Sequence, residues 1–152
     1  KIMFDIPAYG VSLGKIIDII SLFILFNEQE KAKEIYDTFF NEQEKDDWIL
    51  NFLMSDDISD LQTIKGKVKF KKFDLPIQKL ILEGDIEKVK KHMEKKWYKA
   101  NNDAGWYDDH KSPYNIYNGY WAFDIGAIVK KLKLDDSVMK DVDYYPYDLV
   151  HY

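Results

Sequence analysis

The chain has 152 residues, enough for one domain with a sizeable core, and 46% of them are hydrophobic. It contains no cysteine, which excludes disulfides, thiolate zinc sites and cysteine nucleophiles. All 22 basic residues are lysine. Because lysine lacks the bidentate fork that arginine offers to guanine edges and phosphates, specific recognition of nucleic acid is disfavoured.

The net charge of −5 is unevenly distributed along the chain. Residues 1–64 hold 5 lysines against 13 acids, residues 65–100 hold 12 lysines against 5 acids, and residues 101–152 hold 5 lysines against 9 acids. An acidic first part, a basic middle and an acidic end follow one another.

The most apolar stretch, residues 16–26, predicts a buried helix. It is too short for a membrane span, which needs roughly 20 apolar residues, and it contains Asp18 and Ser21. No small-residue cleavage site follows it, so it is not a signal peptide. The chain opens on Lys1 rather than Met. We therefore expect further sequence upstream in the native protein.

Helical periodicity predicts three helices in the first third of the chain. The first spans about residues 10–26. The tetrapeptide Asn-Glu-Gln-Glu then occurs twice, at 27–30 and 41–44, and each copy predicts a helix N-cap with an acidic N3 residue. The apolar residues behind the two copies fall at helical spacing; they are Ala32, Ile35, Tyr36, Phe39 and Phe40, then Trp48, Ile49, Phe52 and Leu53.

Residues 55–72 are irregular, and the alternating run 67–71 is interpreted as an extended linker because it has no strand to pair with. Asp74 predicts the cap of the next helix, with Pro76 in its first turn. Gly84 ends that helix and Asp85 caps another. The predicted buried face of this second helix is formed by Ile86, Val89, Met93 and Trp97.

Residues 101–119 form a long irregular stretch, which is expected to be functional or to be pinned by its own aromatic residues. The candidates for pinning are Trp106, Tyr107, Tyr114 and Tyr117. A helix over 120–129, a helical turn near 135–139 and an extended tail at 144–148 complete the chain. The fold class is therefore all-α: a single-domain bundle of about six helices over residues 1–152, with an aromatic-rich loop before the last long helix.

Catalytic chemistry has few candidate residues. Neither a GxSxG motif nor a Walker loop or GxGxxG motif occurs. Asp108, Asp109 and His110 offer ligand types that bind divalent ions, but adjacent residues do not all face one ion, and no HxxxH or HxxE partner exists. We assign no catalytic residue, no metal ligand and no cofactor.

Asp124 is the single charge in the predicted helix 120–129. An unpaired buried carboxylate is costly, so Asp124 is expected to be a buried structural carboxylate that accepts hydrogen bonds from hydroxyls, indoles or loop amides. The alternative is a charge at a partner-binding cleft. The lysines at 65–72 and 88–99 similarly allow either a solvated face or a phosphate-binding face.

Several elements of the second half resemble one protein family in order and spacing. They are Trp97-Tyr98, Trp106, His110-Lys111, Tyr117-Asn118-Gly119-Tyr120-Trp121-Ala122-Phe123-Asp124, Leu134-Asp135-Asp136-Ser137 and Tyr144-Tyr145-Pro146-Tyr147-Asp148-Leu149. Over about residues 70–150 the chain resembles the C-terminal domain of PoNe immunity protein-like (PoNi-like) proteins. The resemblance leaves residues 1–64 as a helical segment, which we expect to be preceded by more sequence.

The resemblance implies a mostly helical cytoplasmic protein of bacteria that neutralises a co-encoded antibacterial DNase. Such toxins pass between bacteria by contact-dependent secretion, often the type VI system. An acidic inhibitor suits a DNase, because a surface that binds phosphates must be basic. The expected partner is therefore a nuclease toxin, with no membrane and no specific nucleic acid involved.

The candidate partner-binding residues combine carboxylates with neighbouring aromatic rings, a composition that suits protein hot spots. They are Asp108, Asp109, Tyr114, Asp135, Asp136 and Tyr145, with Asp46-Asp47 and Asp56-Asp57 in reserve. Two other functions stay open: a nucleic-acid or phosphate-binding module that uses lysines in 65–99, and a metal-dependent hydrolase centred on His110.

Overall fold

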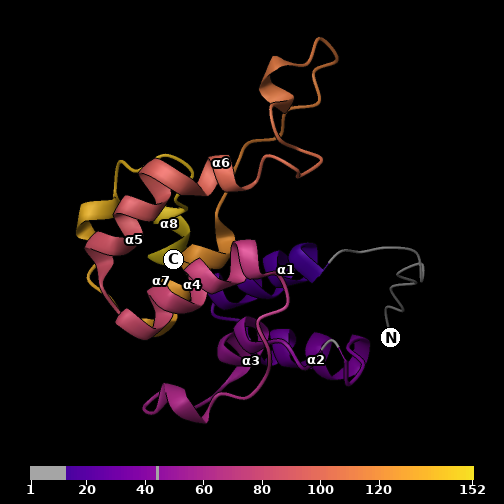
Figure 1. Ribbon diagram of the computed structural model, residues 1–152, viewed down its shortest axis with the longest axis vertical. Coiled ribbons are helices and arrows are strands. Elements are labelled where there is room, and N and C mark those ends of the chain that lie inside the picture. Colours follow the sequence, from indigo (N-terminus) through magenta and orange to yellow (C-terminus); the bar gives the residue numbers. More distant parts are fainter. Residues whose placement is uncertain (1–12, 44) are drawn as a thin grey trace.

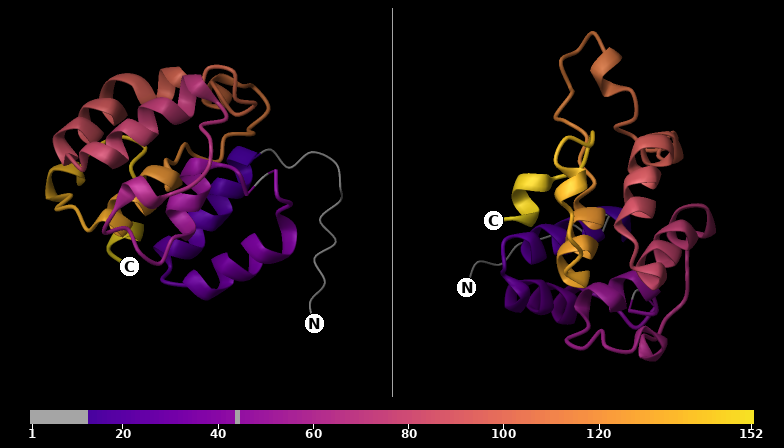
Figure 2. Two further views of the ribbon diagram at one scale, coloured as in Figure 1. Left: turned by 60° about the horizontal axis from the view of Figure 1, so that its bottom comes forward. Right: turned by 90° about the vertical axis from the view of Figure 1, so that its left-hand side faces the viewer.

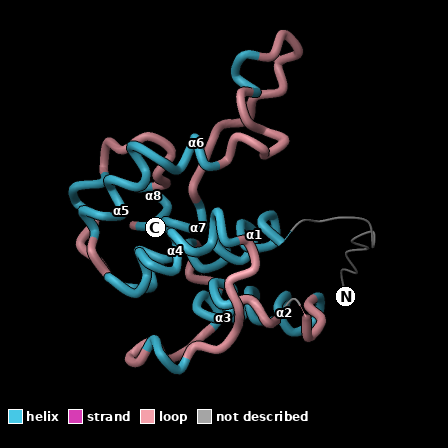
Figure 3. Tube along the Cα trace, viewed as in Figure 1, coloured by secondary structure: helices cyan, strands magenta, loops and turns pink. Residues whose placement is uncertain are grey.

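The computed structural model describes residues 13–43 and 45–152, and within them the regular structure is helical throughout (Figures 1 and 3). No strand occurs in these ranges; the nearest feature is an isolated bridge between Asp47 and Lys67. The expected all-α class is confirmed. None of the helices in the described ranges combines the length and the apolar character that a membrane crossing requires.

Helix α1 (Leu13–Leu25) buries Ile20, Ile24 and Leu25 in the core. The expected start of this helix at residue 10 lies outside the described residues. Asn27, which was expected to cap the next helix, instead adopts a left-handed backbone with a φ of 59°. Its amide group donates a hydrogen bond to the carbonyl of Tyr152 (3.1 Å), so it fastens the end of the chain to the end of α1.

Helix α2 (Gln29–Phe39) packs against α1 and α3, and Ala32 lies on its buried side. The expected cap at Asn41 is also wrong. The Asn41 carboxamide accepts a hydrogen bond from the Gln43 amide in a local turn (2.9 Å). Helix α3 (Trp48–Met54) begins later, where Asp47 accepts a bond from the Leu50 amide (2.8 Å).

Helix α4 (Lys71–Glu83) follows the 3-10 turn η1 (Leu61–Thr63) and starts three residues before the predicted cap. Asp74 lies inside the first turn and accepts a hydrogen bond from the Phe70 amide (2.7 Å). Gly84 ends α4 in a left-handed conformation, and Asp85 caps helix α5 (Ile86–His92), as predicted.

Helix α5 continues through a π turn, η2 (Met93–Trp97), into α6 (Tyr98–Ala100), and we call residues 86–100 the helical rod. Val89, Met93 and Trp97 are buried, as predicted. A repeat of four residues drifts by about 40° per step around an α-helix of 3.6 residues per turn. The wider π turn reverses part of this drift and keeps Trp97 on the core side.

Helix α7 (Phe123–Leu132) is central, since it packs against α1, α3, α4 and α8. This position explains its apolar sequence: residues 125–129 are all buried. The turn η4 (Ser137–Met139) agrees with the predicted helical turn. The tail, however, is not extended to its end, because helix α8 (Tyr147–Val150) folds back against α7.

Residues 101–121 leave the helical body and return to it, and we call them the projecting loop. Figures 1 and 2 show this segment extending away from the packed helices in two different directions of view. Its regular structure is one 3-10 turn, η3 (Asp109–Lys111). The long irregular stretch predicted before the last long helix is therefore confirmed.

Candidate functional site

Aromatic rings from three parts of the chain meet where the projecting loop joins the body. This aromatic base consists of Trp97 and Tyr98 from the helical rod, Trp106, Tyr107, Tyr117 and Tyr120 from the loop and its return, and Tyr144 from the segment after η4. Trp97 stacks on Trp106 with centroids 5.8 Å apart, and Tyr98 stacks on Tyr107 at 4.6 Å. Such pairs add stability beyond the area that they bury.

Hydrogen bonds to two tyrosine hydroxyls fix the loop in place. The Tyr98 hydroxyl donates to Asp108 (2.7 Å), whose other oxygen pairs with Lys111 (2.8 Å). The hydrogen bond from Lys111, and to a smaller extent the one from Tyr98, lowers the pKa of Asp108. The Tyr120 hydroxyl accepts a bond from the backbone amide of His110 (3.0 Å) and lies 2.7 Å from its Nδ1.

These bonds occupy the residues that had suggested a metal site. Asp108 is committed to Tyr98 and Lys111, and the His110 ring contacts Tyr120. Among residues 13–43 and 45–152, histidine and carboxylate side chains nowhere gather in groups of three able to hold a metal ion. Asp109 is half-buried beside them.

The second half of the projecting loop, residues 112–121, runs from its far end back to α7, and we call it the loop tip. It exposes several large apolar side chains, although Tyr120 is buried in the aromatic base. Tyr114 is 82% exposed, and Ile116, Tyr117 and Trp121 are about half exposed. The prediction that Tyr114 helps to pin the loop is therefore wrong, because its ring faces solvent. Asn115 (φ 51°) and Gly119 (φ 90°) provide the left-handed turns that the tip needs.

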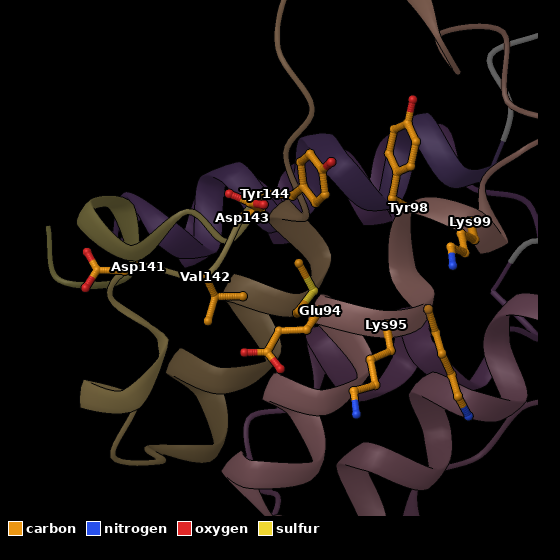
Figure 4. A pocket seen from close by; sticks show the side chains of 10 residues that line it. Glu94, Lys95, Tyr98, Lys99, Asp141, Val142, Asp143 and Tyr144 are labelled. Atoms are coloured by element: carbon orange, nitrogen blue, oxygen red, sulfur yellow. The ribbon is translucent and has the colours of Figure 1, made fainter.

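A groove with a volume of about 380 Å³ lies between the helical rod and residues 141–144. Figure 4 shows its lining side chains, which come from these two segments. The charged ones are three lysines, at 95, 96 and 99, and three acids, at 94, 141 and 143. This balance leaves no surplus of positive charge with which to attract a phosphate.

Two lysines of the lysine-rich segment form ion pairs with acids outside it. Lys67 pairs with Asp46, and Lys72 pairs with Asp103 (3.5 Å). These two pairs join the basic middle of the sequence to one acid before it and one acid after it.

Asp135 and Asp136, which were expected to form an acidic surface pair, have opposite environments. Asp135 is exposed, whereas Asp136 is 3% exposed. Asp136 accepts a hydrogen bond from the Tyr145 hydroxyl (2.7 Å) and lies 2.9 Å from Nε2 of His151. Tyr145 is itself 4% exposed. Asp136 and Tyr145 are therefore interior residues, so the expectation of a surface position is wrong for Asp136, whereas Asp135 lies on the surface as expected.

Asp124 lies in the first turn of α7 and is half-buried. Burial raises the pKa of its carboxyl, while hydrogen bonds from the backbone amides of Ile125 and of Asp124 itself act against that rise. The structural role of Asp124 stays a prediction. Asp18 on α1 is a neighbour that sequence patterns did not single out: burial, followed by the charge of Asp124, raises its pKa to about 7.

The family comparison covers most of this architecture. The model of the PoNe immunity proteins (PoNi), C-terminal, matches residues 45–149. The chain belongs to this family. No curated protein and no solved structure matches the chain significantly.

The match to the PoNe immunity family runs from just before α3 into α8, and thus includes the projecting loop, its aromatic base and the groove. It begins at residue 45, well before residue 70, where the resemblance of individual motifs began. Helix α3 and the linker that follows it are therefore part of the region that the family model matches. Helices α1 and α2 lie before the match.

Proposed function

We propose that this chain protects a bacterium from a nuclease toxin by binding the toxin and blocking its action. The observation that carries the proposal is membership of the PoNe immunity family over residues 45–149. The toxin is a DNase, and protection takes place in the cytoplasm, where the DNA to be protected lies. The protein acts as a stoichiometric inhibitor without catalysis of its own.

The charge of the chain supports a basic partner. A nuclease must bind phosphates, and the chain carries a net charge of −5 without arginine. Exposed acids include Asp56, which lies 3.7 Å from the ammonium group of Lys33, and Asp135, which accepts a bond from the Ser137 amide. Opposite charges on two proteins accelerate their association. The groove, in contrast, has balanced charges and does not favour the alternative of a phosphate-binding module.

The test is a titration of DNase activity. The purified toxin encoded beside this chain is mixed with increasing amounts of it, and the cleavage of a plasmid is followed. A stoichiometric inhibitor abolishes cleavage near one equivalent, and the two proteins elute together in gel filtration. Protection at a small fraction of one equivalent would indicate an enzyme that modifies the toxin, and cleavage unchanged at tenfold excess would refute the proposal.

A further inference from the structure

We infer that the loop tip, residues 112–121, enters the DNA-binding cleft of the nuclease and is the part of this chain that holds the complex together. The inference rests on the proposed function and adds to it a binding surface and a place on the partner. The inference follows from three features: the exposure of apolar side chains at the tip, the contacts that hold the base of the loop, and the absence of charged side chains from the tip.

The exposure of the tip is unusual for apolar side chains. Tyr114 is 82% exposed, Tyr117 48% and Ile116 47%, all within four residues of a loop that projects from the body (Figure 2). Trp121, which is 52% exposed, follows where the loop returns to α7 and stacks on Phe123. Clustered apolar side chains on a protein surface commonly mark a protein interface, and tyrosine and tryptophan are enriched among the residues that contribute most to binding.

The base of the loop prepares the tip for binding. The aromatic base and the bonds of Tyr98 and Tyr120 to Asp108 and His110 hold both ends of the loop. A segment that is ordered before binding loses less conformational entropy when the complex forms. The loop therefore presents its exposed rings without the ordering cost that a disordered loop would incur.

The chemistry of the tip matches a cleft lined by cations. Residues 112–121 contain no charged side chain, and the acids of the projecting loop lie in its first half, where Asp103 pairs with Lys72 and Asp108 with Lys111. In a cleft that binds phosphates, lysine and arginine side chains can lie over the faces of Tyr114, Tyr117 and Trp121, which is an attractive arrangement. A tip without cations is poorly suited to bind single-stranded nucleic acid itself, because such sites combine aromatic rings with positive charge.

The experiment compares loop-tip variants in binding to the toxin encoded beside this chain, with its cleavage residue inactivated. Tyr114→Ala alone, and Tyr114→Ala with Ile116→Ala, should weaken binding by at least about 30-fold, the loss typical of a hot-spot residue. The matched control is Tyr152→Ala, a tyrosine that is 72% exposed at the C-terminus. It should leave the dissociation constant within about twofold. Melting temperatures of all variants check that the fold is retained, and Tyr114→Ala provides the safest reading because this ring has the greatest exposure.

A second measurement locates the loop on the toxin. A labelled DNA duplex that binds the inactivated toxin should be displaced by the wild-type chain but not by the double variant at the same concentration. Failure of the wild-type chain to bind the toxin would refute the proposed function itself. Wild-type binding that the tip variants share would overturn only the loop inference, as would a complex that still binds the duplex. Binding of a labelled single-stranded oligonucleotide to this chain alone, lost in the tip variants, would also overturn it.

Discussion

Replacement of Asp136 by alanine should destabilise the fold strongly. The carboxylate is 3% exposed and accepts hydrogen bonds from two side chains, Tyr145 at 2.7 Å and His151 at 2.9 Å. Burial, and to a smaller extent the bond to Asp136, raises the pKa of Tyr145. The hydroxyl of Tyr145 therefore remains a donor at any physiological pH. In Asp136→Ala this hydroxyl stays buried without an acceptor.

The expected magnitude follows from these contacts. A buried donor left unsatisfied costs about 1–3 kcal/mol, and hydrogen bonds to charged groups contribute about 1.5–3 kcal/mol. Because His151 is half exposed and can turn to water, the larger share comes from Tyr145. The free energy of unfolding should fall by about 3 kcal/mol, which lowers the melting temperature of a chain of this length by roughly 6–12 °C.

The neighbouring residue provides the control for this experiment. Asp135 is exposed and accepts a bond from the Ser137 amide (3.1 Å), so Asp135→Ala should change stability by no more than about 1 kcal/mol. Urea unfolding followed by circular dichroism measures both variants. A double-mutant cycle of Asp136→Ala with Tyr145→Phe should show a coupling of about 1 kcal/mol or more. Equal effects of Asp135→Ala and Asp136→Ala would refute the interior position of Asp136.

Two further changes test the packing around α7. Burial and the charge of Asp124 raise the pKa of Asp18 from 3.8 to about 7. The native state therefore holds a proton between these pH values that the unfolded chain has released, and stability falls as the pH rises through this window. Asp18→Asn cannot ionise, so its unfolding free energy should match wild type near pH 4 and exceed it at pH 8, by up to about 4 kcal/mol; a difference independent of pH would contradict the raised pKa. A methyl group at Gly126 would lie 2.6 Å from Cγ of Pro146, whereas one at Gly105 meets nothing within 4 Å. Gly126→Ala should cost about 1–2 kcal/mol in urea unfolding and Gly105→Ala should be nearly neutral; equal values would show that α8 is not packed on α7.

Local sequence patterns predicted some helix ends and failed at others for a physical reason. Gly84 and Asp85 act within their own turns, by a left-handed backbone and by a side-chain bond to the next amides, so neighbouring residues determine them. Asn27 carries the same type of signal, but its side chain bonds to Tyr152, which is 125 residues away in the sequence. Asn41 forms a local turn instead of a cap. Asparagine side chains can accept bonds from nearby backbone amides in turns as well as at helix starts, so the two structures compete.

For the candidate site, too, the sequence predicted some features and not others. The aromatic residues of 101–119 correctly predicted a loop held by its own rings, since Trp106 and Tyr107 stack on the helical rod. Composition alone does not say which rings face inwards. Tyr114 faces solvent and Tyr145 is buried, although both are tyrosines near acidic residues. In the folded chain the hydroxyl of Tyr145 has a buried acceptor, Asp136. The two residues are nine positions apart, so local sequence patterns do not show this contact.

The arrangement of charge in the folded chain also changes how binding to a basic toxin is best explained. Asp108, a candidate partner-binding residue, pairs with Lys111 and accepts a hydrogen bond from Tyr98 that holds the loop. Its role in binding stays a prediction. Charges at the rim of an interface mainly affect association rates, while the buried contacts at its centre determine dissociation. The loop has paired charge at its base and uncharged rings at its tip. We therefore expect electrostatic steering to come from exposed acids elsewhere on the surface, and we expect the loop to affect the lifetime of the complex rather than the rate at which it forms.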